Sequence, residues 1–323
     1  MKVEEYLKAI EKGLGSYHFG GEPDRLYEPI RYILSIGGKR IRPVLTLMSC
    51  HLFRDDFLQA LYPAMGVEVF HNFTLLHDDI MDDAPIRRGM ATVHEKWDAN
   101  TAILSGDVMM IKAYDLFLAY QSEQLSAILS KFNRCATEVC EGQQLDMLFE
   151  TTMSVNEQQY LEMIRLKTAV LVAFSLELGA IIGGALSAVS DQLYQLGLDI
   201  GIGFQLKDDL LDVYAQSGKF GKQVGGDIIS NKKTYLLIKA LQLASKSQKK
   251  ALQHWLDIDS FDPVAKVEAV KDIYDQLRIQ TLTEQKMNAY FDKALTIFDN
   301  LPVASQRKQP LKNLVDLLIS REK

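Results

Sequence analysis

The chain of 323 residues lacks the features of a small secreted domain and of a sheet protein. Its three cysteines, Cys50, Cys135 and Cys140, are too few for a disulfide framework and indicate a reducing, cytoplasmic compartment. None of its eight prolines falls between Ile86 and Asp262, which permits long helices because proline breaks helix interiors. Asn-Gly hairpin turns and sustained apolar–polar alternation, the usual strand signals, are also missing. We predict an all-α fold, a single domain over residues 1–323 with about ten or more helices.

The sequence also lacks a basic excess and a clear membrane anchor. Its net charge is −6, from 42 acidic and 36 basic residues, which disfavours binding to nucleic acid or anionic membranes. The start, Met1 to Glu5, is too charged for a signal peptide. The apolar stretch from Ala169 to Val189 is long enough to span a bilayer, but Glu177 stands near its centre, where a charge is costly in lipid. We expect a buried core helix there and no transmembrane segment.

Histidine and cysteine are not arranged for the common metal sites. The spacing of Cys135 and Cys140 puts the thiols on different helix faces, which disfavours a zinc site. A diiron bundle needs two Glu-x-x-His motifs, and Glu68–His71 supplies only one. The run His94–Trp97 lacks the second histidine of a metalloprotease helix.

Aspartate, in contrast, is concentrated in two clusters that each follow apolar sequence. The clusters repeat a four-residue spacing, so that on a helix the first and last aspartates of each share a face. Gln205 extends the face of the second cluster. The clustered residues are Asp78, Asp79 and Asp82 in the first motif, and Asp208, Asp209 and Asp212 in the second.

Such spacing has a physical cost. Like carboxylates ~6 Å apart repel by roughly 3 kcal/mol per pair at an effective dielectric near 20. A single acidic run can be a solvated helix end, but two runs embedded in apolar sequence are poorly explained in that way. Oxygen-only ligands favour Mg²⁺, which keeps waters and bridges to substrate phosphates. The pair of clusters therefore indicates a diphosphate held through metal.

Basic residues beside glycine supply the counterpart for an anion. Glycine lets the backbone approach a phosphate, and arginine grips it in fork geometry. Each segment alone is typical of a solvated loop, and together with the aspartates they favour an anion site. The segments are 37–43, 87–89, 219–222, 225–227 and 232–234.

With these motifs in view, the sequence resembles the trans-isoprenyl diphosphate synthase, or polyprenyl synthetase, family. The resemblance covers most of the chain from about Gly37 to Thr234 and follows the family's order of motifs. Two DDxxD motifs in this order are highly specific, and class I terpene cyclases carry a different second metal motif. The matching elements are GGKRIRP at Gly37, HDDIMD at His77, RRG at Arg87, GQQLD at Gly142, KT at Lys167, and FQLKDDLLD at Phe204 with the loop from Lys222 to Thr234.

The resemblance implies an isoprenoid synthase fold around a central cavity, a homodimer, and Mg²⁺-dependent head-to-tail condensation of isopentenyl diphosphate with an allylic diphosphate. It implies about three Mg²⁺ ions per active site, bound by Asp78, Asp82 and Asp208 and supported by Asp79, Asp209 and Asp212 as ligands or through hydrogen bonds. The allylic diphosphate would be bound by Arg87, Lys222 and Lys232. Isopentenyl diphosphate would be bound by Lys39, Arg42, His71 and Arg88. The developing positive charge would face Lys167, Thr168 and Gln205.

Two residues depart from the family's pattern. Asn231 replaces the glycine before the lysine of the last loop, and Ala91 replaces the proline after RRG-x. Both changes put loop details in doubt, and neither removes a charged group.

Product length depends on the residues before the first motif. At ~1.5 Å per residue, Phe73 lies ~7.5 Å and Phe70 ~12 Å before Asp78 along a helix. Helical angles place Phe73 off the aspartate face. Phe70 and Phe73 could therefore serve simply as core residues, without a role in product length. In the family, an aromatic at the position of Phe73 is a floor, and a small residue at the position of Thr74 lets the chain grow. We expect a product of twenty carbons, geranylgeranyl diphosphate, with the fifteen-carbon farnesyl diphosphate as the alternative.

Two other functions remain as weaker alternatives. A terpene cyclase would release a hydrocarbon without consuming isopentenyl diphosphate. A non-catalytic regulatory subunit typically loses aspartates from one motif, whereas all six motif aspartates are present here.

Overall fold

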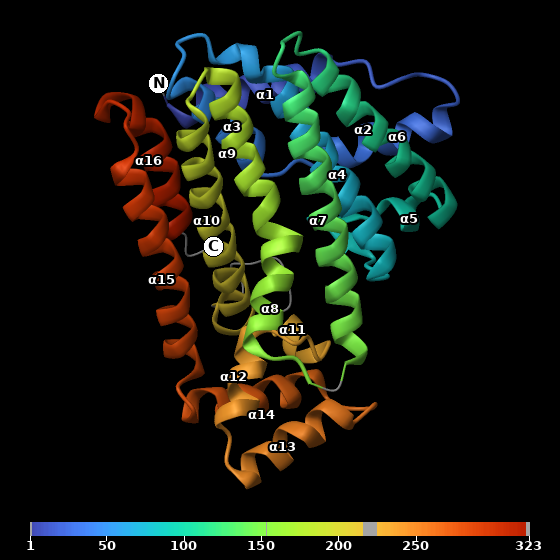
Figure 1. Cartoon of the computed structure of the whole chain (residues 1–323). Helices are drawn as coiled ribbons and strands as arrows, with labels where there is room; N and C mark the ends of the chain where they lie inside the picture. Colours follow the sequence, from blue (N-terminus) through green and yellow to red (C-terminus); the bar gives the residue numbers. More distant parts are fainter. Residues whose placement is uncertain (1, 153, 216–224, 321–323) are drawn as a thin grey trace. The chain divides into compact units, whose positions relative to one another are not determined.

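The computed structural model describes residues 2–152, 154–215 and 225–320. Within these residues the chain forms helices α1 to α16 and one short two-stranded hairpin, which confirms the all-α prediction and the expected number of helices (Figure 1). The chain folds into two compact units, each built from separate stretches of sequence. The assignment of one domain to the whole chain stays a prediction.

The first unit contains residues 1–135, 171–195 and 300–315. Helices α7, α10 and α16 contribute several residues to each unit, whereas α9 and α15 each have one terminal residue in the other unit. The elements of the first unit are α1 (Val3–Ser16), α2 (Asp24–Ser35), α3 (Ile41–His51), the 3-10 helix η1 (Phe57–Ala60), α4 (Leu61–Met81), β1 (Ile86–Arg87), β2 (Met90–Ala91), α5 (Val93–Lys96), α6 (Ala99–Leu118), the start of α7 (Leu125–Thr151), α9 (Val170–Gly183), and parts of α10 (Ser187–Tyr214) and α16 (Ser305–Ser320).

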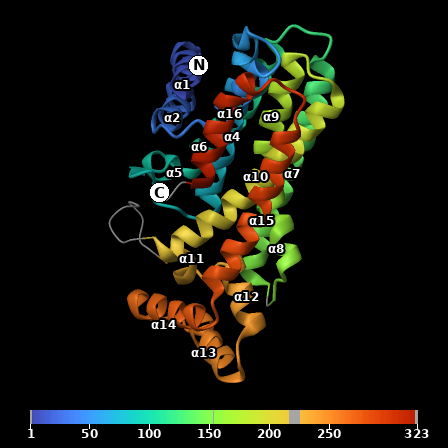
Figure 2. The same cartoon turned by 90° about the vertical axis from the view of Figure 1, so that its left-hand side faces the viewer.

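Helix α4 is the core helix of this unit and carries the first aspartate motif at its C-terminal end. It packs against α6, α3 and α1, and α4 and α6 run side by side in Figure 2. Its middle is buried because apolar residues surround the helix on all sides. The ring of Phe132 lies 5.1 Å from Phe70 and 4.5 Å from Phe117, so Phe70 belongs to an aromatic cluster. Burial of such rings stabilises the unit by about 2 kcal/mol each.

A tight hairpin follows α4 and presents the two arginines of the RRG motif. Ile86 pairs with Ala91 and Arg87 with Met90. The central residues, Arg88 and Gly89, have φ of 52° and 79°, the left-handed pattern of a type I′ turn. Strands of two residues leave no alternating pattern in the sequence, so this hairpin was not predicted.

The apolar stretch that is long enough for a membrane is largely buried within the protein. Among the described residues, one helical stretch, Glu157–Gly183, is long and apolar enough to cross a membrane, and 83% of its most apolar part is buried inside the protein. Glu177, buried in α9, forms a 2.6 Å ion pair with Lys131. The prediction of a buried core helix is therefore confirmed.

The second unit contains residues 136–170, 196–299 and 316–323. Besides parts of α7, α10 and α16, its elements are α8 (Glu157–Ile164), the single π-helical turn η2 (Arg165–Ala169), α11 (Gly226–Ile229), α12 (Tyr235–Leu243), α13 (Lys246–Asp257), α14 (Pro263–Gln276) and α15 (Ile279–Asn300).

The core of this unit forms where α10, α12 and α14 contribute apolar side chains. Leu236 and Ile279 are completely buried in it, and Tyr274 is almost so. Helices α13 and α14 lie next to each other (Figures 1 and 2). The second aspartate motif lies near the C-terminal end of α10, so in both units the aspartates end a long buried helix.

Candidate active site

The first aspartate motif occupies the last turn of α4, where the carbonyl end of the helix dipole is already negative. Carboxylates there are destabilised by each other and by the dipole, which favours a bound cation. Asp79 is buried and accepts hydrogen bonds from Arg87, whose Nη2 lies 2.6 Å from Asp79 Oδ1. Arg87 Nη2 also lies 3.7 Å from Asp78 Oδ2. The hairpin arginine is thereby fixed beside the aspartates, at the edge of the predicted diphosphate site.

The other hairpin arginine meets the glycine-rich loop before α3. A Cβ atom on Gly38 would lie 2.6 Å from Arg88 Nη1, so a larger residue here would displace the guanidinium from its position over this backbone. Gly38 also has a φ of 150°, which L side chains rarely adopt. Burial and the charge of Arg87 lower the pKa of Arg88. The structure therefore brings together two motifs that lie far apart in sequence.

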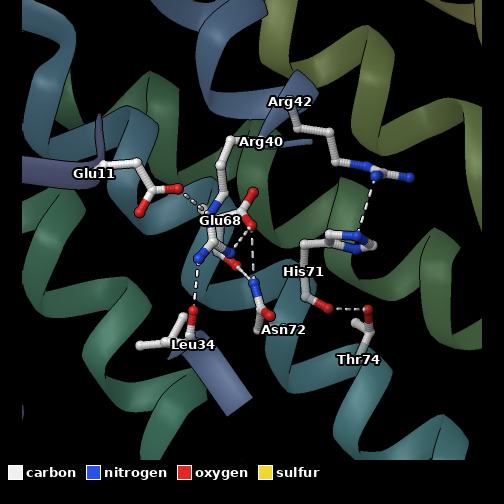
Figure 3. Close-up of polar contacts among 8 residues, drawn as sticks. All are labelled: Glu11, Leu34, Arg40, Arg42, Glu68, His71, Asn72 and Thr74. Carbon is white, nitrogen blue, oxygen red and sulfur yellow. Dashed lines mark hydrogen bonds and ion pairs between the residues drawn. The ribbon is translucent and has the colours of Figure 1, made fainter. Parts of the chain in front are cut away.

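His71 and Arg42 form the adjoining part of this basic region (Figure 3). Arg42 Nη1 donates to His71 Nε2 over 3.1 Å, which places the ring proton of a neutral His71 on Nδ1. Burial, followed by the charges of Arg42 and Arg88, lowers the pKa of His71 well below its ordinary 6.5. His71 is therefore neutral at physiological pH. Lys39, also predicted to bind isopentenyl diphosphate, is exposed in the same loop.

Arg40, between Lys39 and Arg42, has a different role that the sequence did not reveal. Its side chain is buried and donates to Glu68 Oε1 over 2.7 Å, to Glu11 Oε1 over 3.0 Å and to Leu34 O over 2.6 Å (Figure 3). Burial lowers the pKa of Arg40, but the carboxylates outweigh that effect and the pKa is raised. Arg40 therefore anchors the start of α3 within the first unit. Glu68, the glutamate of the single Glu-x-x-His motif, is its partner.

In the second unit, Asp209 is the buried member of its motif. Its carboxylate accepts hydrogen bonds from the Tyr160 hydroxyl and from Gln205 Nε2, the latter over 3.1 Å. Burial, and next the charge of Asp227, raise the pKa of Asp209 to about 8. Tyr160 had no predicted role, because its contact with Asp209 joins residues distant in the chain.

Asp212 organises the loop that contains Lys232. Asp212 Oδ2 accepts from the amide of Asp227 over 2.9 Å, and Asp212 O accepts from the amide of Gly225 over 2.7 Å. The positive charge of Lys232 partly offsets the rise in the pKa of Asp209. Lys222, which like Lys232 was predicted to bind the allylic diphosphate, lies outside the described residues.

The KT motif lies in the π-helical turn η2. Such single turns interrupt the regular α-helical hydrogen bonding and are frequent at functional sites. Lys167 Nζ lies 2.6 Å from Asp146 Oδ2, and the hydroxyl of Thr168 donates to Gln205 Oε1 over 3.2 Å. A Cβ atom on Gly142 would lie 2.2 Å from Lys167 N, so this glycine allows α7 to pass close to η2. These contacts give roles to Gly142 and Asp146 of the GQQLD motif, for which the sequence alone predicted none.

The proposed chain-length residues differ in burial along α4. Phe70 is completely buried in the aromatic cluster, whereas Phe73 is half-buried, with its ring 5.7 Å from Phe70 and 4.8 Å from His77. Thr74 Oγ1 donates to His71 O over 2.8 Å, so its hydroxyl is satisfied by its own helix. Phe73 is thus the less enclosed of the two rings.

Known proteins resemble this chain along most of its length. A sequence model described as polyprenyl synthetase matches residues 23–277. The chain belongs to the polyprenyl synthetase family. It is 37% identical to a geranylgeranyl pyrophosphate synthase of Geoglobus acetivorans over 99% of this chain and 95% of that protein. It is 35% identical to a geranylfarnesyl diphosphate synthase of Natronomonas pharaonis over 93% and 91%. A solved geranylgeranyl pyrophosphate synthase shares 41% identity and a TM-score of 0.94, with 100% of both chains covered.

This polyprenyl synthetase accommodates both departures from the family's pattern. Asn231 has a left-handed φ of 56°, a conformation that asparagine tolerates better than most residues. Its side chain accepts from the buried Lys266 over 2.6 Å and donates to Leu256 O over 3.1 Å. Ala91 keeps the hairpin in place through its carbonyl, which accepts from the Tyr32 hydroxyl over 2.7 Å. The asparagine therefore fixes the loop with side-chain contacts that glycine cannot make.

The two aspartate motifs of this polyprenyl synthetase fit Mg²⁺. Their side chains offer only carboxylate oxygens, the ligand type that this ion prefers. Each motif adds negative charge to a helix end that is already negative, an arrangement that a divalent cation would stabilise. Arg87, Tyr160 and the amide of Asp227 donate to the carboxylates of Asp79, Asp209 and Asp212, respectively, which fits a supporting role for these aspartates.

Proposed function

We propose that this polyprenyl synthetase catalyses the Mg²⁺-dependent head-to-tail condensation of isopentenyl diphosphate with an allylic diphosphate, and that its product is geranylgeranyl diphosphate. The observation that carries the proposal is the basic region of the first unit, where Arg42 contacts His71 and Arg88 packs over Gly38. Arginines held around a neutral histidine, next to paired aspartates, form a site suited to a diphosphate.

We propose that Asp78, Asp82 and Asp208 hold Mg²⁺. When bound, the ion would neutralise charge on the departing diphosphate. Arg87 keeps its guanidinium at the aspartates through Asp79, so it offers positive charge without having to reorganise. We assign Lys232 and Lys222 to the allylic diphosphate as well, as the family resemblance implies.

Ionisation of the allylic substrate leaves a cation that needs dipoles and a water-free site. The hydroxyl of Thr168 donates a hydrogen bond to Gln205. The lone pairs of the hydroxyl oxygen therefore point away from that bond. The carbonyl of Lys167, in the π-helical turn, and the Thr168 oxygen can therefore stabilise positive charge. Asp146 holds the Lys167 side chain to one side. In the condensation, the double bond of isopentenyl diphosphate attacks the cation and the departing diphosphate takes up the released proton.

Two features favour a product of twenty carbons. Phe73 is bulky and half-buried on α4, whereas Thr74 beside it is small. Relatives named for geranylgeranyl products match along almost the whole chain. Farnesyl diphosphate remains the shorter alternative. The geranylfarnesyl relative suggests a longer one.

Two further properties belong to the proposal. We expect a homodimer, as the family resemblance implies, and exposed apolar residues on α6, among them Leu104 and Ile111, are available for a subunit interface. We expect a cytoplasmic location, which the low cysteine content and the mainly buried apolar helix favour.

Arg42→Ala should raise the KM for isopentenyl diphosphate by about ten- to a hundredfold, because a charge-assisted hydrogen bond to a phosphate contributes about 1.5–3 kcal/mol. The KM for the allylic substrate should change little. Steady-state kinetics with each substrate varied in turn measures this difference. Arg54→Ala, which removes an exposed arginine of the same unit, is the matched control and should behave as wild type. An effect confined to the allylic KM would show that Arg42 serves the other substrate.

Phe73→Ala should shift the products beyond twenty carbons. The substitution removes a ring and opens space that a growing chain can fill, at roughly 0.8 kcal/mol per buried methylene. Thr74→Phe should have the opposite effect and shorten the product to fifteen carbons. Chromatography of the dephosphorylated alcohols gives the distribution for each variant.

The control for the proposed role of Phe73 in limiting product length is Leu75→Ala. Leu75 is also half-buried on α4, but two helical positions from Phe73 correspond to a rotation of about 200°, so it points to another side. It should leave product length unchanged. An active Phe73→Ala enzyme with an unaltered distribution would show that Phe73 is only a core residue, and the twenty-carbon proposal would lose its main structural support.

A further inference from the structure

His94, at the start of the short helix α5, is buried without satisfying its polar atoms. Its side chain is only 9% exposed. Among the described residues, neither Nδ1 nor Nε2 has a hydrogen-bond partner. An imidazole whose two nitrogens are removed from water and unpaired costs free energy, so such groups call for an explanation such as an unseen ion.

Two carboxylates lie next to this imidazole. His94 Nε2 is 3.7 Å from Glu95 Oε1, which is too long for a hydrogen bond. Asp83 completes the group, and one ligand atom from each of the three residues lies within 4.8 Å of the others. Asp83 has a left-handed φ of 47°, a conformation that aspartate tolerates, and it lies two residues after the end of α4. The fold thereby joins residues that belong to two unrelated motifs of the sequence.

We propose that Asp83, His94 and Glu95 form a binding site for a divalent transition-metal cation, separate from the Mg²⁺ ligands of the two aspartate motifs. One imidazole and two carboxylates suit Zn²⁺, Mn²⁺ or Co²⁺, whereas Mg²⁺ prefers oxygen ligands alone. Bound ions of this kind hold their ligands about 3 Å apart, so the three side chains need to contract only modestly around the ion.

Because of its position, a metal ion at this site would affect the structure of the hairpin β1–β2. Asp83 precedes the hairpin β1–β2 and His94 follows it, so one ion would tie together both ends of the segment that carries Arg87 and Arg88. Occupancy would therefore restrain the hairpin. This inference concerns metal binding and does not depend on prenyl transfer.

The chain contains a suitable reporter for the test. Of its two tryptophans, Trp97 directly ends α5, whereas Trp255 lies in the second unit. A Trp255→Phe variant leaves Trp97 as the single tryptophan, and excitation at the long-wavelength edge of indole absorption selects it over the tyrosines. Co²⁺ quenches nearby indole fluorescence, so it should quench Trp97 saturably. Mg²⁺ in large excess over Co²⁺ in every sample competes for the oxygen-only sites. Quenching should saturate at one Co²⁺ per chain.

The variants decide where Co²⁺ binds. In the same background, His94→Gln and, independently, Asp83→Asn should each raise the apparent Kd for Co²⁺ at least about tenfold. Asp83 is exposed, so its substitution should not disturb folding, which circular dichroism can verify. His254→Gln, a histidine of the second unit, and Asp78→Ala should leave quenching unchanged. The proposal is overturned by non-saturable quenching in the parent, or by unaltered quenching in both cluster variants.

Discussion

Asp78→Ala or Asp208→Ala is expected to lower turnover by about a thousandfold or more, because each removes a proposed ligand of the Mg²⁺ that would neutralise the leaving diphosphate. The fold should survive. Each aspartate lies near the carbonyl end of a helix beside other carboxylates, and its removal relieves repulsion. Turnover should be measured with saturating substrates and Mg²⁺, and the free energy of unfolding should be measured in parallel.

Asp259→Ala provides the control for this experiment, since Asp259 is an exposed aspartate outside both motifs. Its turnover should equal that of wild type. Chelation of divalent ions should abolish activity in the unmodified enzyme, and Mg²⁺ should restore it. Undiminished turnover in either motif variant, or in excess chelator, would contradict the proposed role of the aspartates.

Arg40→Met is expected to lower the free energy of unfolding by about 3–5 kcal/mol, because it leaves Glu68 as an uncompensated buried charge. The side chains of Arg40 and Glu68 are 2% and 4% exposed, and their closest atoms are 2.7 Å apart. Denaturation by urea, followed by circular dichroism, measures the loss.

The surface pair Arg25–Asp98 is a matched control. Its closest atoms are 2.6 Å apart, but its side chains are 70% and 41% exposed, so Arg25→Met should cost less than about 1 kcal/mol. The double variant Arg40→Met with Glu68→Leu should recover much of the stability, because both charges are then removed. Equal losses in Arg40→Met and Arg25→Met would show that burial does not govern the contribution of Arg40.

The helical architecture could be predicted because its causes are local. The long proline-free sequence and the apolar surroundings of the motifs are properties of neighbouring residues, and α4, α9 and α10 follow from them. The aspartate motifs themselves could be found because four-residue spacing on a helix already specifies a shared face. The hairpin β1–β2 was missed because two-residue strands have no detectable period.

The contacts that distinguish one arginine or aspartate from another could not be predicted. Arg40 and Arg42 are two residues apart in one basic segment, yet Arg40 anchors α3 through Glu68 whereas Arg42 reaches His71. Tyr160 engages Asp209 across a long sequence separation. Such assignments depend on how helices pack, and no local pattern encodes them.

The roles assigned to the substrate-binding residues stay predictions, although the structure gives them a physical setting. Arg88 and Gly38 form one surface, and Thr168 and Gln205 share a hydrogen bond. Lys222 lies outside the described residues, so its proposed contact with the allylic diphosphate depends on the family resemblance.

The central claim is tested most directly by the product of the purified protein. It should be incubated with Mg²⁺, isotopically labelled isopentenyl diphosphate and, in separate reactions, dimethylallyl, geranyl or farnesyl diphosphate. The proposed function predicts label in a twenty-carbon prenyl diphosphate from every starter that is accepted, with one isopentenyl unit added to the farnesyl starter. Release of an unlabelled hydrocarbon, or no consumption of isopentenyl diphosphate in the presence of Mg²⁺, would contradict it.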